Sequence, residues 1–194
     1  MRAAFDAGQR DFGENYVQEA LAKITELDDL RADLRWHLIG PLQSNKAREV
    51  ATHFDWVHSI DRMKLAQRLS DLRPTHLPPL QVCLQVNVSG EDSKSGVAPE
   101  AALALAHAVA RLPRLKLRGL MAIPEAAGDL DAQRAPHAVL RKLLEAMNVE
   151  GLALDTLSIG MSGDLEAAIA EGATWVRIGT AIFGSRVAKS EPTS

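Results

Sequence analysis

Two short loops near the end of the chain combine glycine, a hydroxyl side chain and backbone N–H groups, a combination that can bind phosphate. Met161-Ser162-Gly163-Asp164 follows the apolar run LSIG, and Thr180-Ala181-Ile182-Phe183-Gly184 follows VRIG. Glycine allows close approach of the backbone to an anion, and N–H groups at the start of a helix donate to it. One such loop is more often a simple helix N-cap, but two loops at successive strand ends favour a phosphate site.

Arg177 lies between these loops, in the segment TWVRIG. Strand alternation places Val176 and Ile178 on one face and Arg177 and Gly179 on the other, which predicts that Arg177 points into the protein. A buried guanidinium is unfavourable without partners. We therefore weigh two interpretations, a structural ion pair with an inward carboxylate and a donor to a ligand held between the two loops.

Other polar residues of the predicted strands are weaker candidates. Asn15 and Asn87 end the first and fourth strands, and Glu14 either faces the helices or caps the next one. His37 lies in an apolar strand and is more typical of a hydrogen-bonded core histidine than of a catalytic base. The remaining histidines are expected on helices and loops without zinc-binding spacing. The sequence contains no nucleophile elbow, Walker loop or dinucleotide fingerprint.

Short apolar runs alternate with amphipathic ones along the whole chain, and this pattern predicts a parallel sheet whose strands are joined by helices. Expected strands cover residues 11–15, 35–40, 55–60, 80–88, 115–123, 154–160 and 174–179. Seven units of this kind indicate an α/β protein with a (β/α)₈ TIM-type barrel that lacks its first strand, while an open doubly wound sheet is the alternative. We expect one barrel domain over residues 1–186 and a flexible tail over 187–194.

Composition narrows the class of protein further. The 194 residues carry a net charge of −3, which disfavours a nucleic-acid or membrane-surface partner, and 46% of them are hydrophobic. No apolar run approaches the roughly 20 residues of a membrane span, and the start lacks a secretory signal. The single cysteine, Cys83, rules out an intrachain disulfide and a cysteine-cluster metal site. We expect a cytoplasmic protein.

Six motifs, in order along nearly the whole chain, carry a resemblance to a known family. They are FGENYVQEA (12–20), WHLIGPLQSNK (36–46), SKSG (93–96), RGLMAIP (118–124), LSIGMSGDLEAAI (157–169) and VRIGTAIFG (176–184). At these motifs the chain resembles the pyridoxal 5′-phosphate homeostasis protein family, also called the proline synthetase co-transcribed protein family. The resemblance implies a barrel like the N-terminal domain of alanine racemases, which stands without a second domain, carries pyridoxal phosphate and buffers its supply.

The resemblance also assigns roles to residues of this chain. It assigns the cofactor phosphate to four residues of the two loops: Ser162, Gly163, Gly179 and Thr180. It implies that Arg177 faces the pyridine nitrogen, that Met161 lines the ring and that Asn15 lies near the ring hydroxyl. An arginine at the ring nitrogen does not keep that nitrogen protonated as an aspartate would, so the cofactor becomes a weak electron sink. A weak sink suits a carrier or a racemase-like site.

The family's Schiff-base lysine has no counterpart in the sequence. Family members hold the cofactor aldehyde on a lysine of the first barrel strand, which the resemblance puts before Met1. Lys46 and Lys94 are the lysines expected on loops of the ligand face, and neither has a strand to aim it. We therefore expect non-covalent binding. We interpret the missing strand as a miscalled start or a truncation, and the alternative is a barrel left open at that gap.

The functional hypothesis is a carrier of pyridoxal phosphate without turnover, monomeric, with apo-enzymes that require the cofactor as possible partners. The alternative is a racemase-like enzyme using the same cofactor, which would need the lysine and a second acid–base group. A phosphosugar-handling barrel enzyme would also use the two phosphate loops.

Overall fold

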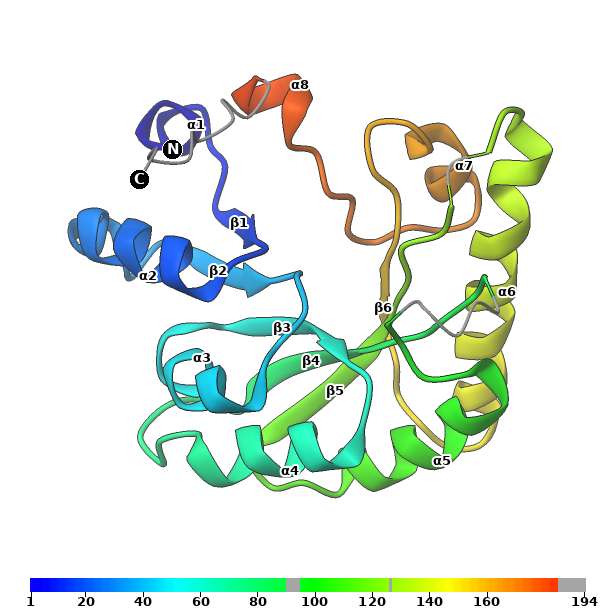
Figure 1. Cartoon of the computed structure of the whole chain (residues 1–194), viewed down its shortest axis with the longest axis horizontal. Helices are drawn as coiled ribbons and strands as arrows, with labels where there is room; N and C mark the ends of the chain where they lie inside the picture. The colour runs from blue at the N-terminus through cyan, green and yellow to red at the C-terminus, as the bar shows by residue number, and fades with distance from the viewer. Residues whose placement is uncertain (90–94, 126, 185–194) are drawn as a thin grey trace, which may run out of the picture.

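Six parallel strands form one curled sheet in which spatial order follows chain order (Figure 1). The computed structural model describes residues 1–89, 95–125 and 127–184. The strands are β1 (Asp11–Glu14), β2 (Arg35–Leu38), β3 (Trp56–Ile60), β4 (Leu80–Gln85), β5 (Leu115–Met121) and β6 (Thr156–Ser158). All neighbouring pairs are parallel, so all of these strands end at the same edge of the sheet.

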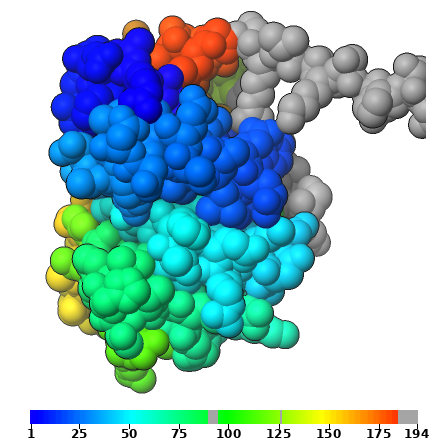
Figure 2. All heavy atoms as spheres, turned by 90° about the vertical axis from the view of Figure 1, so that its left-hand side faces the viewer, coloured from blue at the N-terminus to red at the C-terminus, as the bar shows by residue number. Residues whose placement is uncertain are grey.

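Helices connect the strands and surround the outer face of the sheet, as Figure 1 shows. The α-helices are α1 (Arg2–Asp6), α2 (Val17–Glu26), α3 (Ala47–His53), α4 (Met63–Leu72), α5 (Pro99–Ala110), α6 (Leu130–Val149), α7 (Leu165–Ala170) and α8 (Thr180–Phe183). Two 3₁₀ turns, η1 (Asp28–Leu30) and η2 (Ser44–Lys46), precede β2 and α3. Figures 1 and 2 both show α8 beside α1, so the last described element returns to the first. No helix in the described ranges is long and apolar enough to cross a bilayer.

The two faces of the strands bury different side chains. Leucine, valine and isoleucine residues fill the layer between sheet and helices, including Leu38 and Leu84. The inner face carries a smaller cluster of Trp56, Cys83 and Met121, with Trp175 packed against it. Such alternation is the period of two expected for strands covered on both sides.

The seventh predicted strand, residues 174–179, is not a regular strand. Trp175 forms a single bridge with Ser158, and the Arg177 N–H donates to the Gly160 carbonyl at 2.9 Å. Gly160, two residues beyond β6, has φ of +91°, and the backbone bonding between the two segments is irregular there. The parallel α/β architecture agrees with the prediction, whereas the described residues form six regular strands. The predicted tail, residues 187–194, lies outside the described residues.

Candidate functional site

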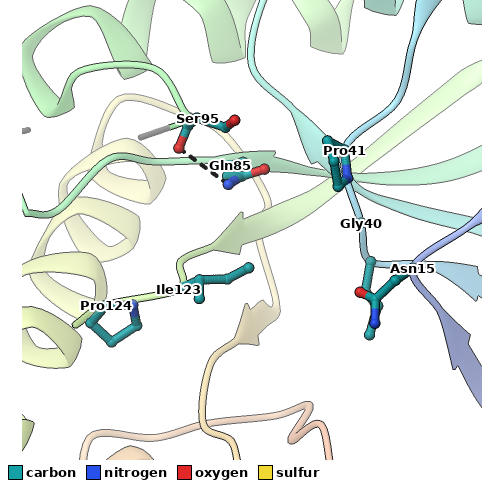
Figure 3. Close-up of a pocket in the computed structure, with 8 residues that line it drawn as sticks. Asn15, Gly40, Pro41, Gln85, Ser95, Ile123 and Pro124 are labelled. Carbon is teal, nitrogen blue, oxygen red and sulfur yellow. Dashed lines mark hydrogen bonds between the residues drawn. The ribbon is translucent and has the colours of Figure 1, made fainter. Parts of the chain in front are cut away.

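A pocket of about 340 Å³ opens where β1, β2, β4 and β5 end (Figure 3). Eight residues, all uncharged, line it: Asn15, Ile39, Gly40, Pro41, Gln85, Ser95, Ile123 and Pro124. In parallel α/β proteins ligands bind at this edge of the sheet, because loops from several strands converge there. The pocket is therefore the natural place for a small ligand.

Close packing of two loops shapes one wall of the pocket. A Cβ atom at Gly40 would overlap the carbonyl oxygen of Asn15, so only glycine allows the loop after β2 to approach the loop after β1 this closely. On another wall, the Gln85 side chain donates to the Ser95 carbonyl at 3.1 Å. Sequence analysis did not select Gln85, and it noted Ser95 only as part of the motif SKSG. The signal for Gln85 was its position two residues after Cys83, on the same inward face of β4.

Of the predicted cofactor residues, Asn15 belongs to the pocket lining, and the residues of the two loops lie outside it. Five others are exposed on the two loops beyond β6 and Trp175: Met161, Ser162, Gly163, Gly179 and Thr180. The bond between Arg177 and Gly160 starts these two loops side by side, as the proposed phosphate site requires.

Arg177 reaches inward from the segment between the two loops and bonds backbone next to the pocket lining. Its Nη1 donates to the Ser158 carbonyl at 2.7 Å and to Ser158 Oγ at 3.0 Å, and its Nη2 donates to the Ala122 carbonyl at 3.0 Å. The next residue, Ile123, lines the pocket. Burial lowers the pKa of Arg177 to about 10, which still leaves a cation at neutral pH. In the described ranges its hydrogen-bond partners are neutral oxygens, so the structure does not show the carboxylate ion pair considered from the sequence.

Asp164 fixes the loop that follows β6. One carboxylate oxygen accepts from the Met161 N–H at 2.7 Å, and the other lies 2.9 Å from His137 Nε2 of α6. Because a carboxylate only accepts, His137 donates this bond. The loop thus has a support from a neighbouring helix that the sequence did not indicate.

Two buried histidines lie in the interior near Arg177. His37 lies on β2 and is hydrogen-bonded to Asp11, as expected of a core histidine. His58 lies on β3 and contacts Ser158. The sequence-based placement of every histidine other than His37 on helices and loops was therefore wrong for His58.

Two lysines of the described residues pair with glutamates. Lys23 of α2 forms an ion pair with the buried Glu14 at 2.6 Å, so Glu14 faces the helices. Lys46 ends η2 and lies 3.9 Å from Glu49. Lys94 lies outside the described residues. Among the residues that are described, no group of three acidic, histidine or cysteine side chains could hold a metal ion.

The fold is that of a known class of barrel. The family model for the alanine racemase N-terminal domain matches residues 1–187. An alanine racemase from Clostridium difficile shares this fold with a TM-score of 0.75 at 11% identity, over 95% of this chain and 47% of that one. The predicted α/β fold of the alanine racemase N-terminal type is thereby confirmed, and the curled sheet of six parallel strands in the described residues is consistent with a partial barrel.

Relatives of higher sequence identity show to which family within this class the chain belongs. The pyridoxal phosphate homeostasis protein of Pseudomonas aeruginosa is 67% identical over 186 residues, which cover 96% of this chain and 79% of that protein. The protein of the same name from Escherichia coli K12 is 55% identical over 184 residues, covering 94% and 79%. Within the alanine racemase N-terminal class, this chain belongs to the family of pyridoxal phosphate homeostasis proteins, which confirms the resemblance found in the sequence.

Two solved structures of PipY from Synechococcus elongatus match along most of their length. Without pyridoxal phosphate the TM-score is 0.88 at 44% identity, and the match covers 94% of this chain and 86% of PipY. With pyridoxal phosphate bound the values are 0.85 and 43%, over 94% and 85%.

Proposed function

We propose that this chain binds pyridoxal 5′-phosphate and serves its homeostasis in the cytoplasm as a carrier without turnover. The proposal rests on membership of a family whose curated members bear that name, and on the relative PipY, whose structure has pyridoxal phosphate bound. The observation that carries it in this chain is an uncharged pocket whose lining residue Ile123 directly follows Ala122, the residue that the guanidinium of Arg177 bonds.

The residues present fit the chemistry of the cofactor. The phosphate needs several donors, and the hydroxyls of Ser162 and Thr180 with the backbone at Gly163 and Gly179 can supply them. Arg177 offers further donors to the ring nitrogen. In our proposal Met161 lines the ring and Asn15 lies near its hydroxyl. When bound, the cofactor supplies an electrophilic aldehyde and a conjugated ring.

The pocket lining supports binding without catalysis. A racemase needs acid–base groups on the two sides of the substrate carbon. The eight lining residues bear none, since their side chains are aliphatic, amide or hydroxyl groups or belong to glycine and proline. We therefore propose a carrier that holds its ligand non-covalently, acts as a monomer and delivers the ligand to apo-enzymes that require it. A racemase-like enzyme is the alternative.

Equilibrium dialysis against pyridoxal phosphate, pyridoxal and glucose 6-phosphate tests the proposal. We expect saturable binding of pyridoxal phosphate, weaker binding of pyridoxal and little binding of the sugar phosphate. A Ser162→Ala/Thr180→Val double variant should lose at least about tenfold in affinity for pyridoxal phosphate and little for pyridoxal. Thr52→Val is the control, because among the described residues the Thr52 hydroxyl bonds only the Arg48 carbonyl of its own helix.

Two readouts of the same samples separate carrier from enzyme. After borohydride treatment, intact mass should be unchanged, and chiral chromatography should find no interconversion of L- and D-alanine. A stable mass increase would contradict non-covalent binding, and racemisation would favour the enzyme. Equal affinity for pyridoxal phosphate and glucose 6-phosphate would overturn the proposed ligand.

A further inference from the structure

We propose that a chain of hydrogen bonds through the barrel interior, formed by Ser158, His58, His37 and Asp11, positions the guanidinium of Arg177 for the ring nitrogen of the bound ligand. In this role Ser158 and His58 are positioning residues that do not touch the ligand. The inference deepens the proposed function and rests on it.

The hydrogen-bond chain joins Arg177 to residues of β6, β3, β2 and β1, and each member is bonded to the next. Arg177 Nη1 lies 3.0 Å from Ser158 Oγ, and Ser158 Oγ lies 2.8 Å from His58 Nδ1. His58 Nε2 lies 3.0 Å from His37 Nδ1, and His37 Nε2 lies 3.0 Å from Asp11 Oδ1. All four contacts have hydrogen-bond length.

The groups at the two ends of the hydrogen-bond chain determine which atom donates in each of its bonds. A guanidinium only donates and a carboxylate only accepts. Arg177 therefore donates to Ser158, and His37 donates through Nε2 to Asp11. When both imidazoles are neutral, the bonds between the ends run the same way: the Ser158 hydroxyl donates to His58 Nδ1, and His58 Nε2–H donates to His37 Nδ1. Every member then donates toward the carboxylate, so the dipoles align between a cation and an anion.

Burial and stacking hold the histidines in this arrangement. His37 and His58 are 4% and 2% exposed, and the His37 ring stacks on Trp56 with a centroid distance of 5.4 Å and an interplanar angle of 9°. Burial, together with the charge of Arg177, keeps the pKa of His58 well below its usual 6.5, which agrees with a neutral ring.

The anionic end is anchored independently. Arg35 donates two bonds to Asp11, from Nε at 2.6 Å and from Nη2 at 2.7 Å. At the other end, both Nη1 protons of Arg177 are bonded to Ser158. In the described ranges, no acceptor bonds its Nε–H or its second Nη2 proton. The hydrogen-bond chain therefore fixes one edge of the guanidinium and leaves its Nε–H and one Nη2 proton as donors for a ligand.

The test compares pyridoxal phosphate with its 1-deaza analogue, in which a C–H group replaces the ring nitrogen. Wild-type protein should prefer pyridoxal phosphate, because the analogue offers no acceptor to Arg177. Ser158→Ala should reduce the ratio of the two affinities about tenfold, since Arg177 loses one of the bonds that orient it. A merely structural role would weaken both ligands equally and leave the ratio unchanged.

Ser59→Ala is the matched control. Ser59 is also a serine buried in the barrel wall, and in the described structure its hydroxyl has no partner. This variant should keep the wild-type ratio. His58→Gln is a second variant that interrupts the chain from the other side of Ser158, and it decides the test if Ser158→Ala does not fold.

The outcomes separate this inference from the proposed function. Tight binding of pyridoxal phosphate with an unchanged ratio in Ser158→Ala and His58→Gln would overturn the positioning role alone. The same would follow from an equal fall of the ratio in Ser59→Ala. Failure of the wild type to bind pyridoxal phosphate would overturn the proposed function, and the inference with it.

Discussion

Asp11 shows how one residue can serve both the stability of the barrel and the order of its interior. It joins Arg35 on the exposed side and His37 on the buried side. Burial alone would raise the pKa of Asp11, but the hydrogen bonds from Arg35 and His37 outweigh it and hold the pKa well below the usual 3.8. A carboxylate with a depressed pKa in the folded state stabilises that state most where it is ionised.

Asp11→Asn should lower the free energy of unfolding by about 1–3 kcal/mol at pH 7. The contribution of Asp11 is complete above its unfolded pKa and is lost as the pH falls toward its folded pKa. Urea unfolding at pH 7, 5 and 3 should therefore show the difference between variant and wild type shrinking at pH 3. Asp33→Asn, which removes a carboxylate from an exposed turn, should change little. A difference that grows on acidification would contradict this account.

Gly40 lies at a position where the fold leaves no room for a side chain. Gly40→Ala should lower stability by about 1–3 kcal/mol, because the added Cβ forces the Asn15 backbone to move. Movement of Asn15 also distorts the pocket wall, so we expect weaker binding of pyridoxal phosphate. Thermal unfolding and dialysis measure the two effects. Gly128→Ala is the control, since a Cβ there meets no atom within 4 Å. Wild-type stability and binding in Gly40→Ala would refute the argument.

At the scale of elements, α6 holds the end of the sheet that carries the proposed phosphate loops. Its Arg134 and Arg141 both bind the buried Glu171 after α7, at 2.7 and 3.2 Å. Its His137, fully buried, supports Asp164 and through it the start of the Met161 loop. The helix therefore controls the geometry of a loop that it does not itself contain.

His137→Leu should weaken binding of pyridoxal phosphate more than binding of pyridoxal. Asp164 loses a buried donor, so the loop that carries Ser162 loses its support, at a cost of about 1–3 kcal/mol in stability. Dialysis with both ligands and thermal unfolding provide the measurements. Val139→Leu is the control on the same helix, because Val139 is 45% exposed. Equal losses for the two ligands would show that His137 acts on the fold alone.

The elements also show where sequence patterns suffice. Mainly apolar runs such as LQVCLQ predict strands, because a strand that is buried on both faces needs apolar side chains on both faces. Residues 174–179 have the same kind of pattern, yet a strand also needs a ladder of partners, and in the described residues Ser158 supplies the single bridge, to Trp175. No local pattern reveals that the backbone bonding between the two segments becomes irregular at Gly160.

At the scale of the whole molecule, the sequence motifs led to the barrel and to its ligand edge, because loops that bind phosphate have local signatures. The chain of hydrogen bonds from Arg177 to Asp11 has no such local signature in the sequence. His58 and Ser158 are 100 residues apart and His37 and His58 are 21 apart. Their contact depends on which strands become neighbours and on their register, and neither follows from the spacing of single residues. The pocket residue Gln85 was missed for the same reason, and Ser95 was noted only as part of the motif SKSG.

The crystal structure of this chain with pyridoxal phosphate tests the central claim most directly. The account predicts one ligand at the edge where β1, β2, β4 and β5 end, with its phosphate bonded by Ser162 and Thr180 and its ring nitrogen facing Arg177. Continuous density from the aldehyde to Lys46, or a phosphate bound away from both loops, would contradict it.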